Sequence, residues 1–496
     1  MPRPAPSGPA PSRPAPSGPA PSRPAPSRPV MPRLPLSPGP GRPSPAVAPG
    51  LARRLRPLRR LVAAAVLGLA PLLAPAAWAQ VEVREITSPG GIDAWLVEEP
   101  SLPFVALEIL FPGGSSLDPE GAEGAASLMA AMLDLGAGDL DEQGFAEAAE
   151  AVAAEFSFSA GGDALSVSAR FLTEFRDESV ALLRLALTEP RFDPDSFERS
   201  RARALSSARS AERTPTTLAF RELARLGWGE HPYARPADGT VASLSALTPE
   251  DVHAAHRRGV VRDRLHVAAV GDIDAETLGA LLDELLGGLA EAEAPLPEQA
   301  SFSVPGGVTV VPFDGPQSVV AFGHAGIDRD DPDFFAAFVM TEVLGGGRFG
   351  TRLMRALREE RGLTYGVGIA LSSRQFGDVV QGRFATSNDR AAEAMEVVRA
   401  EWARMAETGL SEAELEAIQT YLVGAYPLRF DGNARIASIL ASMQMQGLGP
   451  DYMLERNDKV LAVTVEDVAR LSARLLDPQG LHFVVVGRPE GLEASN

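Results

Sequence analysis

The chain has no cysteine among its 496 residues. This absence excludes disulfide bonds, thiolate zinc sites, iron–sulfur clusters and the cysteine that anchors a lipoprotein. The chain also lacks the basic excess that a duplex-binding protein needs, since its net charge is −19. Hydrophobic residues make up 45% of it, which is typical of globular proteins. At ~150 residues per unit, the length suggests two to four folded units with substantial cores.

Acidic residues are absent from the first eighty positions. Residues 1–80 contain eleven arginines and no Asp or Glu, so residues 81–496 carry a net charge of −30. Such asymmetry is typical of a tail or a targeting segment.

Residues 1–50 are predicted to be a disordered, proline-rich arm. They hold nineteen of the 43 prolines and repeat PAPSGPAPSRPAPS with little variation. This composition buries too little apolar surface to offset the entropy of ordering. A proline-rich recognition arm is one alternative. A later translation start is another, since Met31 could also begin the chain.

Residues 51–79 are typical of a secretory signal peptide. The basic segment LARRLRPLRR precedes the apolar run LVAAAVLGLAPLLAPAAWA, and a small-x-small site at 77–79 lies before Gln80. The alternative is a membrane anchor, which Pro71 and Pro75 weaken because proline interrupts a helix. No later segment is long and apolar enough to cross a bilayer. We therefore expect export across the inner membrane, to the periplasm.

The remainder contains an internal repeat. LTPEDVHAAH (247–256) resembles VTVEDVARLS (463–472), and LHVAAVG (265–271) resembles LHFVVVG (481–487) at the same offset of 216 residues. In each copy Thr followed by Glu-Asp predicts the start of a helix, and the apolar run predicts a buried strand. A period of this length indicates duplicated domains.

The predicted fold class is α+β, with two homologous domains that each pack a mostly antiparallel sheet against helices. We place the domains at 80–290 and 308–490, with an acidic, proline-rich linker at 291–307. Predicted strands are 81–87, 93–98, 103–111, 156–160, 164–171, 264–270, 308–312, 318–324, 364–372, 377–386 and 481–486. Predicted helices are 121–135, 142–154, much of 174–227, 249–258, 274–288, 331–344, 350–361 and several up to about 475.

Four segments resemble the pitrilysin/insulinase metallopeptidases, a family that includes the mitochondrial processing peptidases and related bacterial periplasmic proteins. They are FPGGSSLDPEGAEGAASLMAAML (111–133), GEHPYARPADGT (229–240), LTPEDV (247–252) and GGGRFGTRLMRALREERGLTYGVG (345–368). The resemblance covers about 81–490. It implies two repeated α+β domains that enclose a peptide between them.

Active members of this family carry a His-x-x-Glu-His motif, in which the histidines bind zinc and the Glu is the general base. A second Glu about 76 residues later completes the ligands. The resemblance places these four positions at Ser127, Ala130, Ala131 and Ser207, none of which can serve. The first histidine of the chain is His231, so no alignment restores the motif. We therefore expect no zinc or other cofactor on this chain.

The resemblance also implies a substrate-binding Arg and Tyr, seven residues apart in the second domain, at Arg358 and Tyr365. We expect Arg358 near the end of a helix that Gly362 breaks, and Tyr365 at the start of the next strand. A guanidinium can hold a peptide carbonyl or carboxylate, and a phenol can donate to an oxyanion. The alternative is that Arg358 is a solvated helix residue and Tyr365 is a core aromatic.

Some bacterial members of the family are heterodimers in which one subunit brings the zinc helix and the other the Arg/Tyr pair. This chain resembles the second type. It is thus expected to be inactive alone, to bind peptide, and to act on the zinc site of a homologous partner. The alternative is a structural or peptide-binding protein with no part in catalysis, as in the core subunits of the mitochondrial respiratory complex.

Three weaker sequence patterns also bear on candidate functional sites. Gly345, Gly346 and Gly347 lack the Gly-Lys-Ser/Thr of a phosphate loop, and the resemblance implies a loop that covers the peptide chamber. His253 and His256 share one helix face, either as a solvated pair or as a metal site that would need Glu250 or another ligand. A stand-alone peptidase with an unconventional metal site is a third functional alternative, which the missing ligands disfavour. No Gly-x-Ser-x-Gly motif supports a serine nucleophile.

Overall fold

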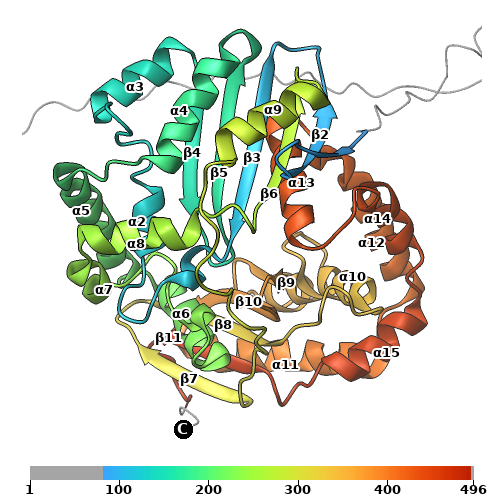
Figure 1. The fold of residues 1–496 in the computed structure, drawn as a ribbon. Helices are drawn as coiled ribbons and strands as arrows, with labels where there is room; N and C mark the ends of the chain where they lie inside the picture. Colours follow the sequence, from blue (N-terminus) through green and yellow to red (C-terminus); the bar gives the residue numbers. More distant parts are fainter. Residues whose placement is uncertain (1–81, 493–496) are drawn as a thin grey trace, which may run out of the picture. The chain divides into compact units, whose positions relative to one another are not determined.

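A computed structural model of the chain describes residues 82–492 (Figure 1). The described residues belong to one compact unit. The predictions for the arm at 1–50 and for the signal peptide at 51–79 lie outside the described residues. Within 82–492, none of the helices combines the length and apolarity that a bilayer crossing requires.

The described chain contains two sheets and the helices that cover them. The strands are β1 (Arg84–Thr87), β2 (Asp93–Glu98), β3 (Phe104–Pro112), β4 (Glu155–Ala160), β5 (Ala164–Leu172), β6 (His266–Gly271), β7 (Gly307–Pro312), β8 (Gln317–Ala325), β9 (Val367–Arg374), β10 (Gly377–Ser387) and β11 (His482–Gly487). The α-helices are α2 (Ala125–Ala130), α3 (Glu142–Ala151), α4 (Arg176–Thr188), α5 (Pro194–Ala211), α6 (Pro215–Trp228), α7 (Val241–Ala246), α8 (Pro249–Gly259), α9 (Ala275–Leu286), α10 (Phe334–Gly345), α11 (Ala391–Thr408), α12 (Glu412–Ala425), α13 (Asn433–Met445), α14 (Tyr452–Leu461) and α15 (Val465–Leu475).

The two sheets have equivalent topologies. Their strand orders are β1-β2-β6-β3-β5-β4 and β7-β11-β8-β10-β9, so the second repeats the first without β1. In both, the last strand of the repeat inserts parallel to one neighbour and antiparallel to the other. The predicted α+β fold with two related, mostly antiparallel sheets is confirmed, with one parallel pair in each sheet.

The repeated Thr-x-Glu-Asp segments begin equivalent helices, as predicted. The Thr248 hydroxyl accepts a hydrogen bond from the amide of Asp251, whose carboxylate accepts one from the amide of Thr248, and Thr464 and Asp467 form the same pair. Each capping box satisfies two amides that a helix start leaves free. The two copies therefore share local chemistry as well as register.

Each sheet is covered on one face by helices of its own half and on the other by a helix of the opposite half. The first sheet packs α13 against β3 and β6, although α13 lies more than 160 residues further along the chain (Figure 1). The apolar core there joins Trp95 and Leu110 of the sheet to Ile436 and Leu440 of α13. Both faces of this sheet are thus buried, which explains the continuous apolar run of β6.

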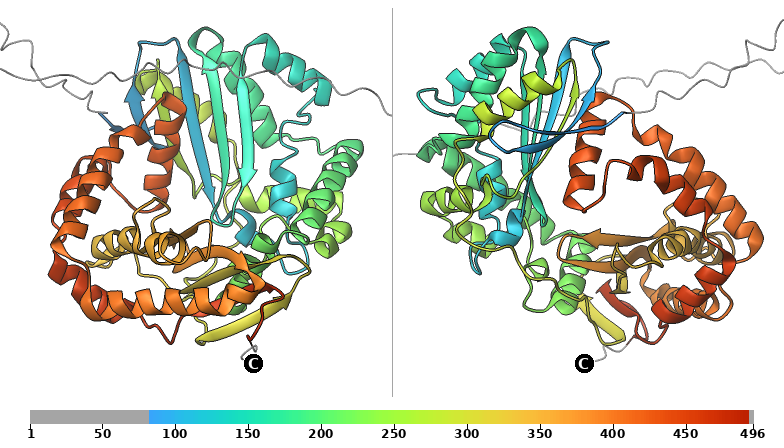
Figure 2. Two further views of the ribbon diagram at one scale, coloured as in Figure 1. Left: turned by 180° about the vertical axis from the view of Figure 1, so that it is seen from behind. Right: turned by 45° about the vertical axis from the view of Figure 1, so that its right-hand side comes forward.

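The second sheet receives α6 in the same way. This helix packs against β8 and β11, and the core there includes Leu223 and Trp228 of α6 with Ala321 and Val484 of the sheet (Figure 2). The equivalent helices α6 and α13 are therefore exchanged between the halves. Burial of both sheet faces in this way makes the stability of each half depend on the other.

A polar cluster also connects the two halves. The Tyr233 hydroxyl donates to the carboxylate of Asp163 and accepts the amide hydrogen of Phe376 at 3.0 Å. Arg374 lies 3.3 Å from the same carboxylate, with its guanidinium carbon 3.4 Å from the Tyr233 ring centroid. Burial and the negative charge of Asp163 raise the pKa of Tyr233, so this phenol stays protonated.

Two predicted helices differ from the structure. The helix predicted at 121–135 is reduced to Ala125–Ala130, because Gly121 and Gly124 take positive φ before it and tight i→i+3 turns follow it. The segment predicted at 350–361 becomes a wide π-helical turn, Met354–Glu359, after a short α-helical start. Both differences fall in segments that carry predicted site residues.

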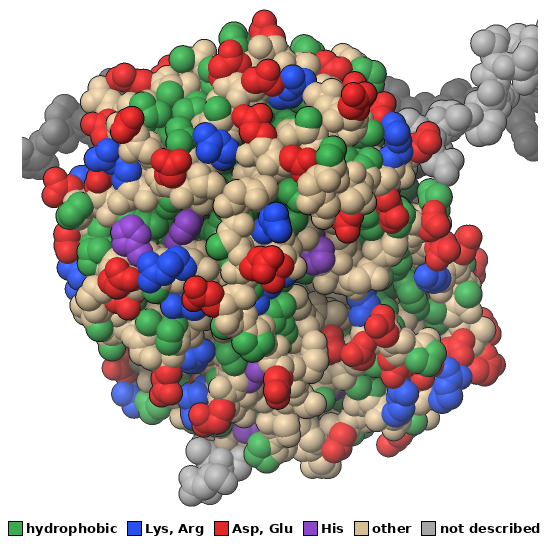
Figure 3. Space-filling model, in the orientation of Figure 1, with side chains coloured by type: hydrophobic (Ala, Val, Ile, Leu, Met, Phe, Trp, Pro, Cys, Tyr) green, Lys and Arg blue, Asp and Glu red, His purple; other side chains and the backbone are tan. Residues whose placement is uncertain are grey.

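The surface carries its acidic and basic side chains intermixed. On the face shown in Figure 3, acidic side chains are scattered among basic ones rather than gathered in one field. Charges of both signs therefore alternate on this face, without a single-sign field there.

Candidate functional site

The segment at the former zinc positions is anchored by a buried aspartate. The carboxylate of Asp118 accepts hydrogen bonds from the amides of Gly124 and Ala126 at 3.0 and 3.1 Å, at the start of α2. Burial raises the pKa of Asp118 to about 7, although these amides and the charges of Arg258 and Arg235 oppose the shift. Sequence reasoning did not identify Asp118, because nothing in the sequence marks a residue seven positions before the helix as its cap.

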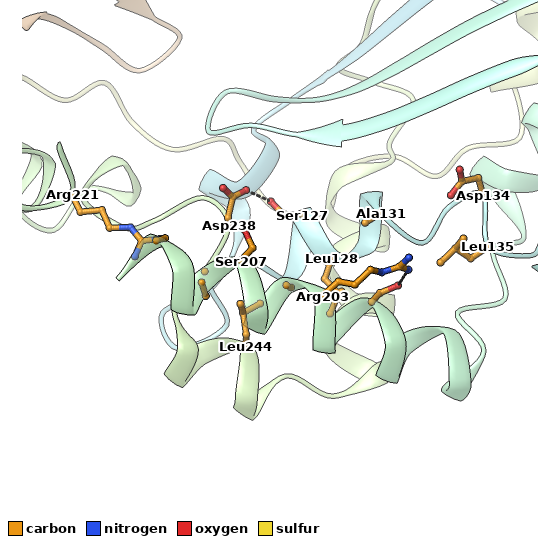
Figure 4. Close-up of a pocket in the computed structure, with 16 residues that line it drawn as sticks. Ser127, Leu128, Ala131, Asp134, Leu135, Arg203, Ser207, Arg221, Asp238 and Leu244 are labelled. Atoms are coloured by element: carbon orange, nitrogen blue, oxygen red, sulfur yellow. Dashed lines mark hydrogen bonds between the residues drawn. The ribbon is translucent and has the colours of Figure 1, made fainter. Parts of the chain in front are cut away.

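Three of the four degenerate zinc positions line one pocket. Ser127, Ala131 and Ser207 face a cavity of about 630 Å³ between α2, α5 and the loop before α7 (Figure 4). Ala130 is buried and does not line this cavity. The Ser127 hydroxyl lies 3.1 Å from the carbonyl oxygen of Ala237 and 3.5 Å from the carboxylate of Asp238. The structure thus brings three of the four predicted motif positions to one pocket.

The pocket offers no metal donor set. Among residues 82–492 no group of three or more His, Cys, Asp or Glu is arranged to hold a metal ion. The charged side chains that line the pocket are Asp134, Asp238, Arg203 and Arg221, two of each sign. Burial raises the pKa of Asp134, with Arg203 acting against the shift. Hydroxyls, arginines and two separate carboxylates suit polar peptide contacts better than a catalytic zinc ion.

The second half presents an arginine between two exposed rings. The guanidinium carbon of Arg358 lies 4.7 Å from the ring centroid of Tyr365 and 4.9 Å from that of Phe349. Tyr365 is 87% exposed and Phe349 is 70% exposed, so neither is a core aromatic. The structure therefore brings the two predicted residues together and adds Phe349 to them.

Local backbone features place this group. Arg358 lies near the end of the π-helical turn, a wide form of helix that is frequent at functional sites. Gly362 follows with φ of +59°, a conformation that favours glycine. Tyr365 lies two residues before β9 rather than at its start, because Thr364 holds a bend by accepting the Gly366 amide hydrogen at 3.2 Å.

Comparison with known proteins identifies the family. The description "Insulinase (Peptidase family M16)" matches residues 94–241, and "Peptidase M16 inactive domain" matches residues 246–422; together they span more than half of the chain. The chain belongs to the M16 peptidase family. The first match lies within the first half, whereas the second begins before α8 and β6 of the first half and extends to α12 of the second.

The most similar proteins include members with and without a protease name. A non-peptidase homolog of Helicobacter pylori is 27% identical over 66% of this chain and 76% of its own, and an uncharacterized zinc protease of Mycobacterium leprae is 27% identical over 80% and 89%. The crystal structure of an M16 inactive domain from Pseudomonas fluorescens matches with a TM-score of 0.77 and 28% identity, over 84% of this chain and all of that one.

One structural neighbour belongs to a multi-subunit assembly. A chain of Complex III2 from Candida albicans matches with a TM-score of 0.68 over 83% of this chain and 98% of its own. At 16% identity this likeness concerns the fold alone. The M16 fold is therefore compatible with a place in a larger complex.

Within the M16 family this chain is an inactive homologue, since none of its four motif positions provides a zinc ligand or a general base. The polar pocket at Ser127 and the exposed pair at Arg358 are separate features. Neither Arg358 nor Tyr365 lines the pocket.

The glycine-rich segment of this M16 chain forms an open connection beside the Arg358 group. Gly345 ends α10, Gly346 follows it, and Gly347 has φ of +75° with no other atoms near the place of a Cβ. Phe349 projects from the same connection onto Arg358. The signal that could have identified Phe349 is its place in the quoted motif, as a large apolar residue between glycines.

The histidine pair serves packing. The His256 ring lies 2.8 Å from the carbonyl oxygen of Leu187, and burial lowers its pKa. The Phe192 ring contacts both His253 and His256 edge-on, while Glu250 pairs with Arg257 at 2.8 Å. The interpretation of a simple solvated pair is therefore wrong for His256, and these contacts do not form a metal site.

Proposed function

We propose that this protein is the non-catalytic subunit of a heterodimeric zinc metallopeptidase, in which it binds peptide and contributes Arg358 and Tyr365 to a partner's zinc site. The observation that carries the proposal is the exposure of the two rings, Tyr365 and Phe349, that flank Arg358. A solvent-facing tyrosine and phenylalanine on either side of one arginine have little structural reason, whereas such groups are common where peptides or partners bind.

Each member of the group has a distinct chemical role in this proposal. The Arg358 fork donates hydrogen bonds to a peptide carbonyl or carboxylate, and the two rings limit its rotamers before substrate arrives. The Tyr365 hydroxyl donates to the oxyanion that develops at the scissile carbonyl. The zinc ion of the partner would supply the Lewis acid and the activated water.

The first half supplies a route for an extended peptide. Strand β4 is the outermost strand of its sheet, opposite β1. The Ser127 hydroxyl lies 3.4 Å from the carbonyl oxygen of Ala160, at the end of β4, so the edge strand leads to the pocket. A peptide added to β4 as a further strand would pass the residues that replace the zinc ligands.

The test is cleavage of a mixed peptide library by this protein alone, by a zinc-site homologue from the same cell alone, and by the mixture. We expect cleavage to rise only in the mixture. Arg358→Ala and Tyr365→Phe should each lower kcat of the mixture by about 10²–10³ while association, followed by analytical ultracentrifugation, is retained. Arg355→Ala is the matched control. Arg355 is exposed on the same turn and forms no ion pair with any of residues 82–492.

The result also separates the alternative. If the mixture is active and both variants keep full activity, this chain completes the complex without taking part in catalysis. If the mixture is no more active than the homologue alone, a structural or peptide-binding role replaces the proposal. Chelator-sensitive cleavage by this protein alone would contradict both.

We further propose that the protein works outside the cytoplasm, in the periplasm. The support is the signal-like segment at 51–79, which ends in a small-x-small site. Fractionation of cells that express the full chain should find the mature protein in the periplasmic fraction with Gln80 as its first residue. Protein that stays with the membrane would indicate an uncleaved anchor.

A further inference from the structure

A second cavity, independent of the proposed peptidase role, gathers four arginines. It has a volume of about 450 Å³ and lies between α13, α14, the connection from α12 to α13, and the loop after β8. Its basic lining residues are Arg329, Arg429, Arg435 and Arg456, and its lining contains no Asp or Glu. Such a cavity is unexpected in a region that carries a net charge of −30 from residue 81 onward.

None of these four arginines has an ion pair with a carboxylate within 4 Å in residues 82–492, although many other arginines there do. Arg456 is only 6% exposed, and burial lowers its pKa. A buried charge is normally paired, because its desolvation is otherwise uncompensated. The cavity therefore has positive charge that the protein itself does not neutralise at close range.

Neutral groups hold the buried Arg456 and the partly buried Arg329 in place. Arg456 donates to the carbonyl oxygen of Leu422 at 3.0 Å and lies over the Tyr426 ring, 4.5 Å from its centroid. Arg329 donates to the Tyr452 hydroxyl at 2.8 Å, while its buried Nε has no hydrogen-bond partner. These contacts fix the guanidinium groups without using up all of their donors, which pre-organises them for an external acceptor.

Acidic residues nearby lie outside the cavity lining. Glu342 acts on Arg456 and Asp378 on Arg329 through longer-range attraction. Asp328 and Asp378 line an adjoining polar cavity, which shares Arg329 and Gln446 with this one. These carboxylates moderate the positive potential without forming a contact. Arg429 and Arg435 are exposed, so they can contact a ligand that enters from solvent.

We propose that this cavity binds a small oxyanion with more than one negative charge, either a phosphate compound or a polycarboxylate. Planar guanidinium groups match both, since each presents paired donors to paired oxygens. The cavity is large enough for several such groups, and its tyrosine rings leave room for an apolar or planar part of the ligand.

The experiment is calorimetric titration of the purified chain with inorganic pyrophosphate in one arm and with citrate in the other, at ~50 and ~200 mM salt. We expect one site per chain for at least one anion, weaker at the higher salt. Arg429→Ala and Arg435→Ala should each weaken binding about tenfold or more, as expected for a hydrogen bond to a charged group. Arg435→Lys should retain part of the affinity, because it keeps the charge but loses the fork.

Arg209→Ala is the matched control. Arg209 is exposed on α5, does not line this cavity, and forms no ion pair with any of residues 82–492. Circular dichroism should show that all variants remain folded. Binding that depends on Arg429 and Arg435 and not on Arg209 supports the site, and the active arm tells phosphate from carboxylate. No binding of either anion, or equal binding by the Arg429→Ala/Arg435→Ala double variant, overturns it. Neither result bears on the Arg358 group.

Discussion

The exchange of α6 and α13 leads to a prediction about how the halves depend on each other. Leu440 of α13 belongs to the second half, yet it is completely buried against the first sheet in one core with Trp95. Leu440→Ala should therefore loosen the first half, although no residue of that half is changed. The matched control is Leu415→Ala in α12, which is also buried but lies in the core of the second half alone.

The magnitude follows from burial. A leucine to alanine change in a core costs about 2–5 kcal/mol, from the lost transfer free energy and the cavity that remains. Leu440 has no exposed surface and sits between a helix and a sheet that both resist collapse, which favours the upper half of that range. Because proteins are stable by only about 5–15 kcal/mol, the loss should be visible while the protein still folds.

The assay is urea unfolding of protein labelled with fluorotryptophan, followed by fluorine NMR. Trp95, Trp228 and Trp402 report separately on the first sheet with α13, on α6 with the second sheet, and on the core of the second half. Leu440→Ala should shift the Trp95 signal in the native state and lower its midpoint, whereas Leu415→Ala should leave the native Trp95 signal in place.

An unchanged Trp95 signal and midpoint in Leu440→Ala would refute this reasoning. So would separate unfolding transitions of the two halves in the unmodified protein, since the exchanged helices should make them unfold together.

Three further outcomes are expected. Burial raises the pKa of Asp118 to about 7 from 3.8, so its contribution to stability is fully present below about pH 4 and is lost as the pH rises through 7. Urea unfolding at several pH values should show a fall in the free energy of unfolding over this range that Asp118→Asn lacks. Parallel pH profiles of the two proteins would contradict this expectation. The two hydrogen bonds from Arg352 lower the pKa of Glu414 to about 2 from 4.5, so its contribution is present above pH 4.5 and disappears as the pH falls toward 2. After allowance for solvent screening, Glu414→Gln should cost about 1–2 kcal/mol at pH 6 and less at pH 3, which thermal unfolding can check. Mass spectrometry of the purified protein should find no stoichiometric zinc, and a chelator should leave the midpoint of thermal unfolding unchanged. One zinc ion per chain would show that the protein does contain a set of zinc ligands.

The sequence predicted most elements near the site, because their signals are local. Capping pairs such as Thr248 and Asp251 mark helix starts, and short apolar runs mark buried strands. It missed the shortening of α2, which depends on glycines in left-handed conformations and on the distant cap Asp118. It also missed Phe349 as a neighbour of Arg358, since contact across a loop leaves no periodic signal.

By itself, the sequence determined that this chain is a duplicated M16 homologue without the zinc motif, because residue identity alone decides which side chains can bind a metal. Only the tertiary structure decided which helix covers which sheet, since α6 and α13 hold equivalent places in the two halves and local sequence does not say that each packs on the opposite sheet. The structure alone also brought Arg329 into one cavity with three arginines that lie at least 100 residues further along the chain. Such groupings arise from packing between distant elements, which local sequence patterns do not encode.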